Sequence, residues 1–318
     1  MISTSRLSLP VFESLNDAFV AVLGELVSHG ATTERITDTT SVGSRFGASP
    51  RATTELLAAG FSIANPRARW ISSERRGLNR VFAVANTIWT FSGSDAAEDI
   101  VPYNARGADF ARDGVLEGAV GGRIFGSMVG DQIATAIESL RRHKSSRRAV
   151  VHVLSPQDLV TPPLDTPCTI SLQYIVREGR LDTITSMRSQ SAALLLPYDV
   201  FLFSMLQEVV ANELGVGLGT YHHFCGSLHY YDDEARLVQD ILGECNSNST
   251  NDLVMEAMPA NALASMQAAI CAERDMRRHV MDVDDSSMTR QTIALHPYWK
   301  TLLAPLEARL HERKALAS

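Results

Sequence analysis

Apolar side chains recur with a helical period in several parts of the chain. In residues 19–27 they stand three and four positions apart, and the pattern stops at Gly30, a residue common just after a helix end. The same periodicity, or an unbroken apolar run, predicts further helices at 81–91, 133–140, 200–214, 263–270 and 298–314. These stretches indicate a largely helical scaffold.

A different pattern fills the middle of the chain. After Cys168, apolar residues occupy every second position as far as Val176, which is typical of a half-buried strand. The alternation breaks at Glu178-Gly179 and resumes over 181–187, so we expect a hairpin that brings Arg188 back to the level of Cys168. A thiol and a cation should therefore lie side by side.

Other segments have less regular patterns. Residues 149–154 alternate as a strand, whereas 31–50 are rich in Thr, Ser and Gly and read as a loop. Residues 220–231 are interpreted as a loop that leads into a short strand. Asp199 stands before the predicted helix 200–214, where it is suited to an N-cap role.

Composition narrows the class of protein. With 318 residues, 45% of them hydrophobic and 20% charged, the chain can bury a substantial core. A net charge of -7 argues against non-specific nucleic-acid binding. No apolar run reaches the roughly 18 residues that span a bilayer, and no basic start precedes an apolar run, so we expect neither membrane insertion nor export.

The four cysteines carry no Cys-x-x-Cys spacing, so neither a metal site nor a disulfide framework is predicted, and reduced thiols in the cytoplasm are expected. Two arginine-bearing segments have alternative readings. Arg147 and Arg148 follow a cationic helix end, where they could either remain solvated or clamp a phosphate. Likewise, Arg35 and Arg45 lie in the 31–50 segment, which is either a solvated connector or a cover for a ligand phosphate.

Taken in order, several short motifs together resemble the thymidylate synthase family over about residues 15–235. The motifs are Ser-Arg-Arg at 146–148, Pro-Cys-x4-Gln at 167–173, Arg-Ser at 188–189, Leu-x-Leu-Pro-Tyr-Asp at 194–199 and His-Tyr-Tyr at 229–231. The resemblance implies an α/β (α+β) fold, with a bent mixed sheet flanked by helices. It also implies a homodimer with sheets packed back to back. The whole chain, 1–318, would form one such domain, with 246–318 a divergent helical C-terminal segment.

The resemblance also assigns roles. In that family a cysteine thiolate, here Cys168, adds to C6 of a pyrimidine nucleotide, and C5 then attacks a one-carbon unit carried by 5,10-methylenetetrahydrofolate. Arg188 and Ser189 match phosphate ligands of the same subunit. Arg147 and Arg148 match arginines that reach the phosphate from the partner subunit. His229 and Tyr231 match residues that bind the sugar hydroxyl, and Gln173 matches a position beside the nucleophile.

One departure from the family pattern concerns the base. Asp199 stands where the family normally has asparagine. An amide both donates and accepts hydrogen bonds, whereas an ionised carboxylate only accepts, so it suits the N4 amino group of cytosine and repels O4 of uracil. The same exchange distinguishes the family's deoxycytidylate hydroxymethylases, which add water rather than hydride and form a 5-hydroxymethyl group.

Other departures affect catalysis and folate binding. Asn86 replaces the family's catalytic glutamate, so proton transfer must use another group or water. Thr39 replaces a loop arginine that contacts phosphate, which leaves Arg45 or Arg35 for that role. Ser191 replaces an aspartate, Thr169 replaces a histidine and Ser227 replaces another aspartate. The final residues lack the family's hydrophobic tail.

These observations predict an enzyme that hydroxymethylates CMP or dCMP at C5, possessing Cys168 as its nucleophile and Asp199 as its base reader. Two alternatives remain open. In the first, the chain is a uridylate-methylating enzyme in which Asp199 is protonated or turned away. In the second, it is a catalytically silent nucleotide-binding relative, as Asn86 and the altered folate positions would allow.

Overall fold

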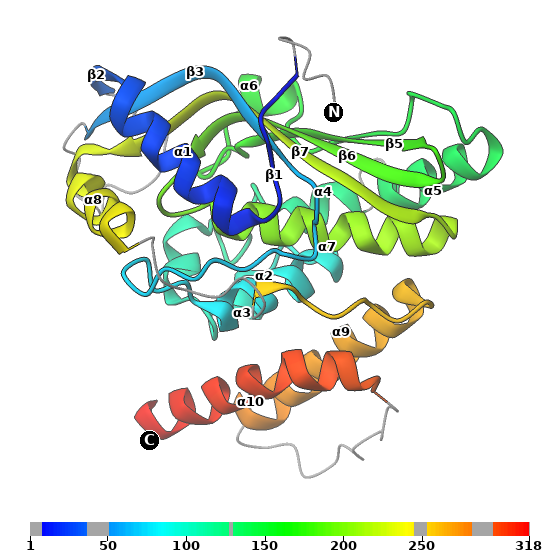
Figure 1. Cartoon of the computed structure of the whole chain (residues 1–318). Helices are drawn as coiled ribbons and strands as arrows, with labels where there is room; N and C mark the ends of the chain where they lie inside the picture. Colours follow the sequence, from blue (N-terminus) through cyan, green and yellow to red (C-terminus); the bar gives the residue numbers. More distant parts are fainter. Residues whose placement is uncertain (1–7, 37–50, 127–129, 245–252, 282–294, 318) are drawn as a thin grey trace.

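One mixed sheet organises the molecule, with strands in the order β1-β3-β7-β6-β5-β4 and β2 paired to β3 (Figure 1). The computed structural model describes residues 8–36, 51–126, 130–244, 253–281 and 295–317. The strands are β1 (Val11–Phe12), β2 (Ala31–Ile36), β3 (Arg51–Ile63), β4 (Val150–His152), β5 (Thr169–Arg177), β6 (Arg180–Ser191) and β7 (Gly217–Tyr231). Two pairs, β1 with β3 and β6 with β7, are parallel, and the other pairs are antiparallel.

Helices cover this sheet and extend below it. They are α1 (Leu15–His29), α2 (Arg80–Phe91), α3 (Ala97–Ile100), α4 (Val120–Ile124), α5 (Gln132–Arg142), α6 (Gln157–Val160), α7 (Leu196–Leu214), α8 (Ala235–Glu244), α9 (Ala262–Met281) and α10 (Pro297–Ala317). All six helices predicted from periodicity are confirmed within these bounds. In the described part of the chain, no helix is both long enough and apolar enough to cross a bilayer.

Helix α7 is the centre of the core. It packs against β6 and β7 on one side and against α1, α2, α5 and α9 on others (Figure 1). Its residues from Val200 to Ala211 are buried, which explains why the sequence is apolar on nearly every face. The helix ends at Gly215, whose φ of 63° is a left-handed conformation that glycine adopts without steric cost.

The predicted hairpin is present as β5 and β6. Glu178 and Gly179 form its turn with φ of 51° and 72°, the positive values that a tight two-residue hairpin turn requires. The strands pair in register with Thr169 opposite Met187, so the end of β6 returns to the start of β5. The sequence prediction for this element is therefore confirmed.

Two loop predictions were wrong. Residues 220–231 belong to β7, a fifteen-residue strand that pairs with both β3 and β6. Residues 31–36 form β2 rather than part of a loop, and the rest of the predicted loop, 37–50 with Thr39 and Arg45, lies outside the described residues. Long-range pairing with β3 accounts for both strands, because a partner far along the chain leaves no local signal.

The described part of residues 246–318 contains α9 and α10, which pack against each other and against α2 at the bottom of Figure 1. Trp299 of α10 is buried in this contact, and its indole N–H donates to the Ser265 hydroxyl of α9 at 3.1 Å. The two helices therefore support α2 from the side opposite the sheet.

Candidate functional site

The thiol and the cation predicted to be neighbours do lie together at one end of the hairpin. The backbone N–H of Arg188 donates to the carbonyl oxygen of Cys168 at 2.8 Å. The Arg188 guanidinium then reaches back to the loop before β5, where it donates to the carbonyl oxygens of Thr166 (2.8 Å) and Pro167 (2.9 Å). Ser189 follows as a half-buried residue of β6. Arg188 thus ties down the segment that presents Cys168.

The environment of Cys168 holds the thiol in its protonated form. Burial raises the pKa of Cys168 to about 11, and the nearby Asp199 and Asp165 carboxylates raise it further while Arg188 opposes them. The sequence predicts the direction of the Arg188 effect but not that burial outweighs it. The cysteine is half-buried and is not in a disulfide, so a ligand can approach it.

Asp199 is not a helix cap. The N-cap of α7 is Leu195, which makes no side-chain capping bond, and Asp199 is the fourth residue of the helix. Its Oδ2 accepts a hydrogen bond from the side-chain amide of Gln190 at 2.8 Å. Burial raises the pKa of Asp199 to about 6, with Gln190 acting to lower it and Asp165 to raise it. The capping interpretation is therefore wrong, and the carboxylate lies near enough to Cys168 to raise the pKa of the thiol.

The end of β7 adds His229 and Tyr231 to this cluster. His229 is paired with Ser191 of β6, so it lies at the same end of the sheet as Arg188. Burial lowers the pKa of His229, which keeps the ring neutral and able to share hydrogen bonds with a hydroxyl group. Tyr231 packs edge-on against His229, with ring centroids 5.0 Å apart, and lies near enough to Cys168 for the two to interact electrostatically.

Three residues important to this end of the sheet were not identified from the sequence. Gln190 contacts Asp199, Asp165 interacts with both Cys168 and Asp199, and Arg51 lies over the Tyr231 ring at 3.7 Å. Arg51 also pairs with Asp233 and Glu234. Only the position of Gln190, directly after the Arg-Ser motif, offered a sequence signal.

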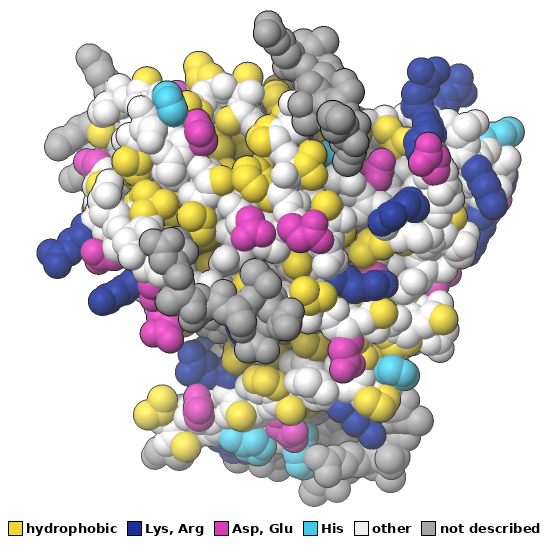
Figure 2. Space-filling model, viewed as in Figure 1, with side chains coloured by type: hydrophobic (Ala, Val, Ile, Leu, Met, Phe, Trp, Pro, Cys, Tyr) yellow, Lys and Arg dark blue, Asp and Glu magenta, His cyan; other side chains and the backbone are white. Residues whose placement is uncertain are grey.

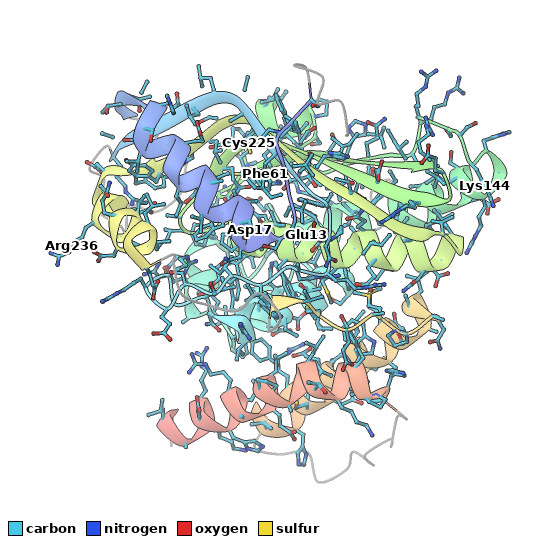
Figure 3. The ribbon with its side chains drawn as sticks, in the orientation of Figure 1. Glu13, Asp17, Phe61, Lys144, Cys225 and Arg236 are labelled. Atoms are coloured by element: carbon cyan, nitrogen blue, oxygen red, sulfur yellow. The ribbon has the colours of Figure 1, made fainter. Side chains whose placement is uncertain are left out.

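Arg147 and Arg148 lie at the other end of the sheet. Val150 pairs with Gln173, so these arginines enter β4 opposite the far half of β5. Figure 3 shows Lys144, in the same cationic run, at the right edge of the view, away from Cys225 near the middle. Exposed basic side chains gather there in Figure 2, over the end of α5 and the turn into β4. Neither arginine forms an ion pair within the described residues.

The prediction that Gln173 stands beside the nucleophile was wrong. Gln173 lies five residues beyond Cys168 along β5, a separation of roughly 16 Å at the usual strand rise. Its side-chain amide donates to the carbonyl oxygen of Arg147 at 2.9 Å. Gln173 therefore supports the turn that carries the two exposed arginines.

Asn86 lies on the face of α2 that packs against Tyr198. Phe82, one turn earlier on the same helical face, packs edge-on against Tyr198 with centroids 5.1 Å apart, and Tyr198 immediately precedes Asp199. Asn86 is half-buried, and its amide has no hydrogen-bond partner among the described side chains and backbone. An amide cannot supply an ionisable proton, so Asn86 can orient a ligand or water but cannot act as an acid or base.

Of the remaining predicted site residues, Arg45 lies outside the described part of the chain, and no side-chain position is described for Arg35. Ser191 is buried, and its hydroxyl has no partner within the described residues. Thr169 is also buried, whereas the Ser227 hydroxyl donates to Glu55 at 2.6 Å. Of these three, Ser191 has a hydroxyl that is both buried and unpaired within the described residues.

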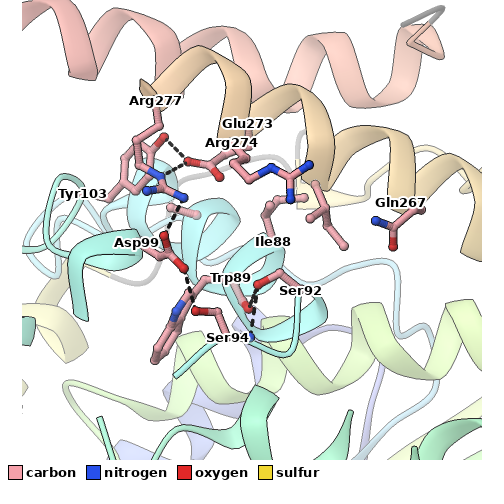
Figure 4. A pocket seen from close by; sticks show the side chains of 12 residues that line it. Ile88, Trp89, Ser92, Ser94, Asp99, Tyr103, Gln267, Glu273, Arg274 and Arg277 are labelled. Carbon is pink, nitrogen blue, oxygen red and sulfur yellow. Dashed lines mark hydrogen bonds and ion pairs between the residues drawn. The ribbon is translucent and has the colours of Figure 1, made fainter. Parts of the chain in front are cut away.

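A separate pocket of about 200 Å³ lies between α2 and α9 (Figure 4). One wall is a closed network in which the Tyr103 hydroxyl donates to Glu273 at 2.7 Å and Arg277 pairs with Glu273 and Asp99. Ala85, Ile88 and Ser92 bring another face of α2 to the pocket, roughly 100–160° around the helix from Asn86. Among the described residues, no group of three His, Cys, Asp or Glu side chains is arranged to hold a metal ion.

Comparisons with known proteins identify the family of the chain. The family model described as thymidylate synthase matches residues 67–271. A deoxyuridylate hydroxymethyltransferase of Bacillus phage SP01 is 28% identical over 199 residues, which cover 56% of this chain and 50% of that protein. A thymidylate synthase of Encephalitozoon cuniculi is 37% identical over 103 residues, or 32% of this chain and 35% of the relative. The chain thus spans half or less of the length of these relatives.

The fold is also shared with a solved structure. The thermostable thymidylate synthase A from Bacillus subtilis superimposes with a TM-score of 0.60 at 21% identity, over 74% of this chain and 86% of that one. This likeness confirms the expected α/β fold with a mixed sheet flanked by helices. The family model covers well over half of the chain and includes Cys168, Arg188, Asp199 and His229. The chain therefore belongs to the thymidylate synthase family.

Proposed function

We propose that this chain is a one-carbon transferase that acts at C5 of a pyrimidine nucleoside monophosphate, and that it hydroxymethylates CMP or dCMP. The choice of cytosine rests on the Asp199 carboxylate. The side-chain amide of Gln190 donates a hydrogen bond to this carboxylate at the end of the sheet where Cys168 and Arg188 lie. Family membership supports the reaction class, and the phage relative is named as a hydroxymethyltransferase.

Each residue of the cluster has a chemical task in this proposal. The Cys168 thiolate adds to C6 of the base, and the electron pair displaced from the C5–C6 bond makes C5 nucleophilic. Arg188 and Ser189 hold the phosphate, and His229 and Tyr231 bind the sugar hydroxyl. Asp199 accepts a hydrogen bond from the N4 amino group of cytosine. Because the pKa of Cys168 is raised to about 11, the thiol is protonated at neutral pH in the free protein and must lose this proton before it adds to C6.

The one-carbon donor in this proposal is 5,10-methylenetetrahydrofolate, which supplies the carbon that becomes the hydroxymethyl group. The unpaired and buried hydroxyl of Ser191 fits a second heterocyclic ligand, because such a group needs a hydrogen-bond partner. The Asn86 amide is a further polar group of α2 without a partner among the described residues. Ser191 and Asn86 would orient the donor or a water molecule.

A partner subunit is also part of the proposal. Arg147 and Arg148 are too far along the sheet to reach a phosphate at Arg188 of their own chain, but they are exposed and have no ion pair within the described residues. In a homodimer with sheets packed back to back, they would enter the phosphate site of the other subunit. This arrangement explains why two adjacent arginines lie free at a strand entrance.

A uridylate substrate is the second candidate, because the phage relative is named for deoxyuridylate and because Asp199 has a pKa of about 6. The test measures kcat/KM for CMP, dCMP, UMP and dUMP with methylenetetrahydrofolate and identifies each product by mass. Hydroxymethylated product from a cytidylate is expected. Turnover of uridylates alone would refute the cytosine assignment, and no turnover of any nucleotide would support a silent binding protein.

A further inference from the structure

A chain of buried side chains continues behind Asp199. The Gln190 side-chain nitrogen lies 2.8 Å from Asp199 Oδ2, and its oxygen lies 3.2 Å from Nε2 of His223. On the other side of the ring, Nδ1 of His223 lies 3.1 Å from the hydroxyl of Tyr221. Gln190, His223 and Tyr221 are all buried between the sheet and α7.

The charge on Asp199 gives this chain one direction. An ionised carboxylate only accepts hydrogen bonds, so Gln190 must turn its NH2 group to Asp199 and its oxygen to His223. His223 must then carry its proton on Nε2, which leaves Nδ1 to accept from Tyr221. Burial lowers the pKa of His223 to about 3, so the ring is neutral as this arrangement requires. The second N–H of the Gln190 amide faces the Ser191 carbonyl oxygen at 3.5 Å.

The other groups around Asp199 do not stabilise its charge. Four titratable groups face Asp199. They are the carboxyl of Asp165 in the loop before β5, the thiol of Cys168 at the start of β5, and the phenol of Tyr221 and the thiol of Cys225 on β7. None of these is a cation, and burial acts with Asp165 to raise the pKa of Asp199. The hydrogen bond from Gln190 is the interaction that acts in the opposite direction.

We propose that Gln190 is a positioning residue that determines base specificity: His223 and Tyr221 orient its amide, which keeps Asp199 an ionised acceptor and thereby favours cytosine over uracil. This inference rests on the proposed cytidylate function. Without the amide, Asp199 would bind a proton at higher pH and could then donate to O4 of uracil.

The test compares the wild-type protein with Gln190→Met, which preserves side-chain length but lacks the amide. The ionisation of Asp199 is followed by carbon-13 NMR of labelled aspartate carboxyls, with Asp199→Asn identifying the signal. The midpoint is expected to move to higher pH, and the ratio of the UMP and CMP Kd values at neutral pH to fall at least about tenfold, the scale of a hydrogen bond to a charged group.

Two further variants separate orientation from general damage. His223→Phe preserves a ring against Phe61, whose centroid lies 5.2 Å away, but removes the Nε2–H. The Asp199 midpoint should therefore rise and the ratio of the UMP and CMP Kd values should fall, each by less than in Gln190→Met. Gln207→Met removes another buried amide beside α7, one that donates to the Leu181 carbonyl oxygen at 2.9 Å. It should lower stability without changing the Asp199 midpoint or the Kd ratio.

An unchanged midpoint in Gln190→Met would overturn the proposal, as would a raised midpoint with an unchanged Kd ratio. The NMR titration needs no substrate, so it distinguishes this proposal from the proposed function. A further outcome is that the wild-type protein binds no cytidylate while the Asp199 midpoint still rises in Gln190→Met. In that case the proposed function fails, and only the statement that Gln190 keeps Asp199 ionised stands.

Discussion

At the scale of single residues, burial at one end of the sheet raises the pKa of two acids, but it leaves them in opposite protonation states at neutral pH. It raises the pKa of Cys168 to about 11 and that of Asp199 to about 6. At neutral pH the thiol is therefore protonated while the carboxyl is largely ionised. The free protein thus presents a carboxylate acceptor beside a protonated thiol, and the proposed mechanism requires that the thiol lose its proton before it attacks the base.

The exchange Asp199→Asn tests the acceptor. An amide can donate to O4 of uracil, so the ratio of kcat/KM for CMP to that for UMP should fall, with a change of roughly tenfold or more. Steady-state kinetics with both nucleotides measure this ratio. The matched control is Asp131→Asn at the true N-cap of α5, where the carboxylate accepts from the Ala134 N–H at 2.8 Å. An unchanged ratio in Asp199→Asn would mean that Asp199 does not contact the base.

The exchange Arg188→Ala tests the phosphate site. Loss of a charged hydrogen bond should weaken CMP binding by about 1.5–3 kcal/mol, and release of the Thr166 and Pro167 carbonyls should loosen the segment before Cys168. Titration calorimetry gives the Kd. Arg180→Ala is the control, because Arg180 lies at the far end of β6 and also donates to a carbonyl, that of Leu218 at 3.1 Å. Normal CMP binding by Arg188→Ala would place the phosphate elsewhere.

At the scale of elements, α2 connects the site to the C-terminal helices. One face carries Phe82 and Asn86 toward Tyr198, and another packs on α9 beside the network of Tyr103, Glu273 and Arg277 (Figure 4). The position of Asn86 therefore depends on helices that are remote from it in sequence.

Breaking this network with Glu273→Ala should lower the free energy of unfolding by about 1–3 kcal/mol, because the Tyr103 hydroxyl loses its acceptor and Arg277 retains only Asp99. Urea denaturation measures the change. Glu138→Ala removes an exposed ion pair with Arg142, at 2.7 Å, and should cost about 0.5 kcal/mol or less. Equal effects of the two substitutions would show that the Glu273 network adds no stability.

The same scale explains what the sequence could predict. The β5–β6 hairpin was predictable because its alternation and its Glu178-Gly179 turn are local signals, and this placed Cys168 beside Arg188. Strand β7 was missed because His222, His223 and Gly226 interrupt its apolar alternation, and its stability comes from pairing with β3 and β6.

The sequence resemblance was less accurate for tertiary contacts. It identified Asp199 but not the Gln190 amide that holds it, because that contact joins β6 to the first turn of α7. It also placed Gln173 beside Cys168, whereas five residues of extended strand separate them. Distances along a strand and contacts between elements require the folded arrangement.

At the scale of the whole molecule, the arginines that we propose to bind phosphate lie at two ends of one sheet. Arg188 is next to Cys168, while Arg147 and Arg148 are beside the far half of β5. The proposal that both sets bind one phosphate therefore requires a second copy of the chain.

Mixing two inactive variants tests this requirement. Cys168→Ala lacks the nucleophile, and Arg147→Ala with Arg148→Ala lacks the exposed arginines. After exchange of subunits, about a quarter of wild-type activity should return, because half of the dimers are hybrids with one complete site. Each variant alone, taken through the same exchange, is the control. Failure to regain activity, with hybrids verified by native mass spectrometry, would contradict a shared site.

The central claim is that Cys168 attacks C6 of a cytidylate and so activates C5. Release of tritium from C5-labelled CMP and dCMP, in the presence of methylenetetrahydrofolate, measures this step directly. The account predicts release by the wild-type protein from a cytidylate, slower release from labelled UMP and dUMP, and none above background by Cys168→Ala. Release from uridylates alone, or undiminished release by Cys168→Ala, would contradict it.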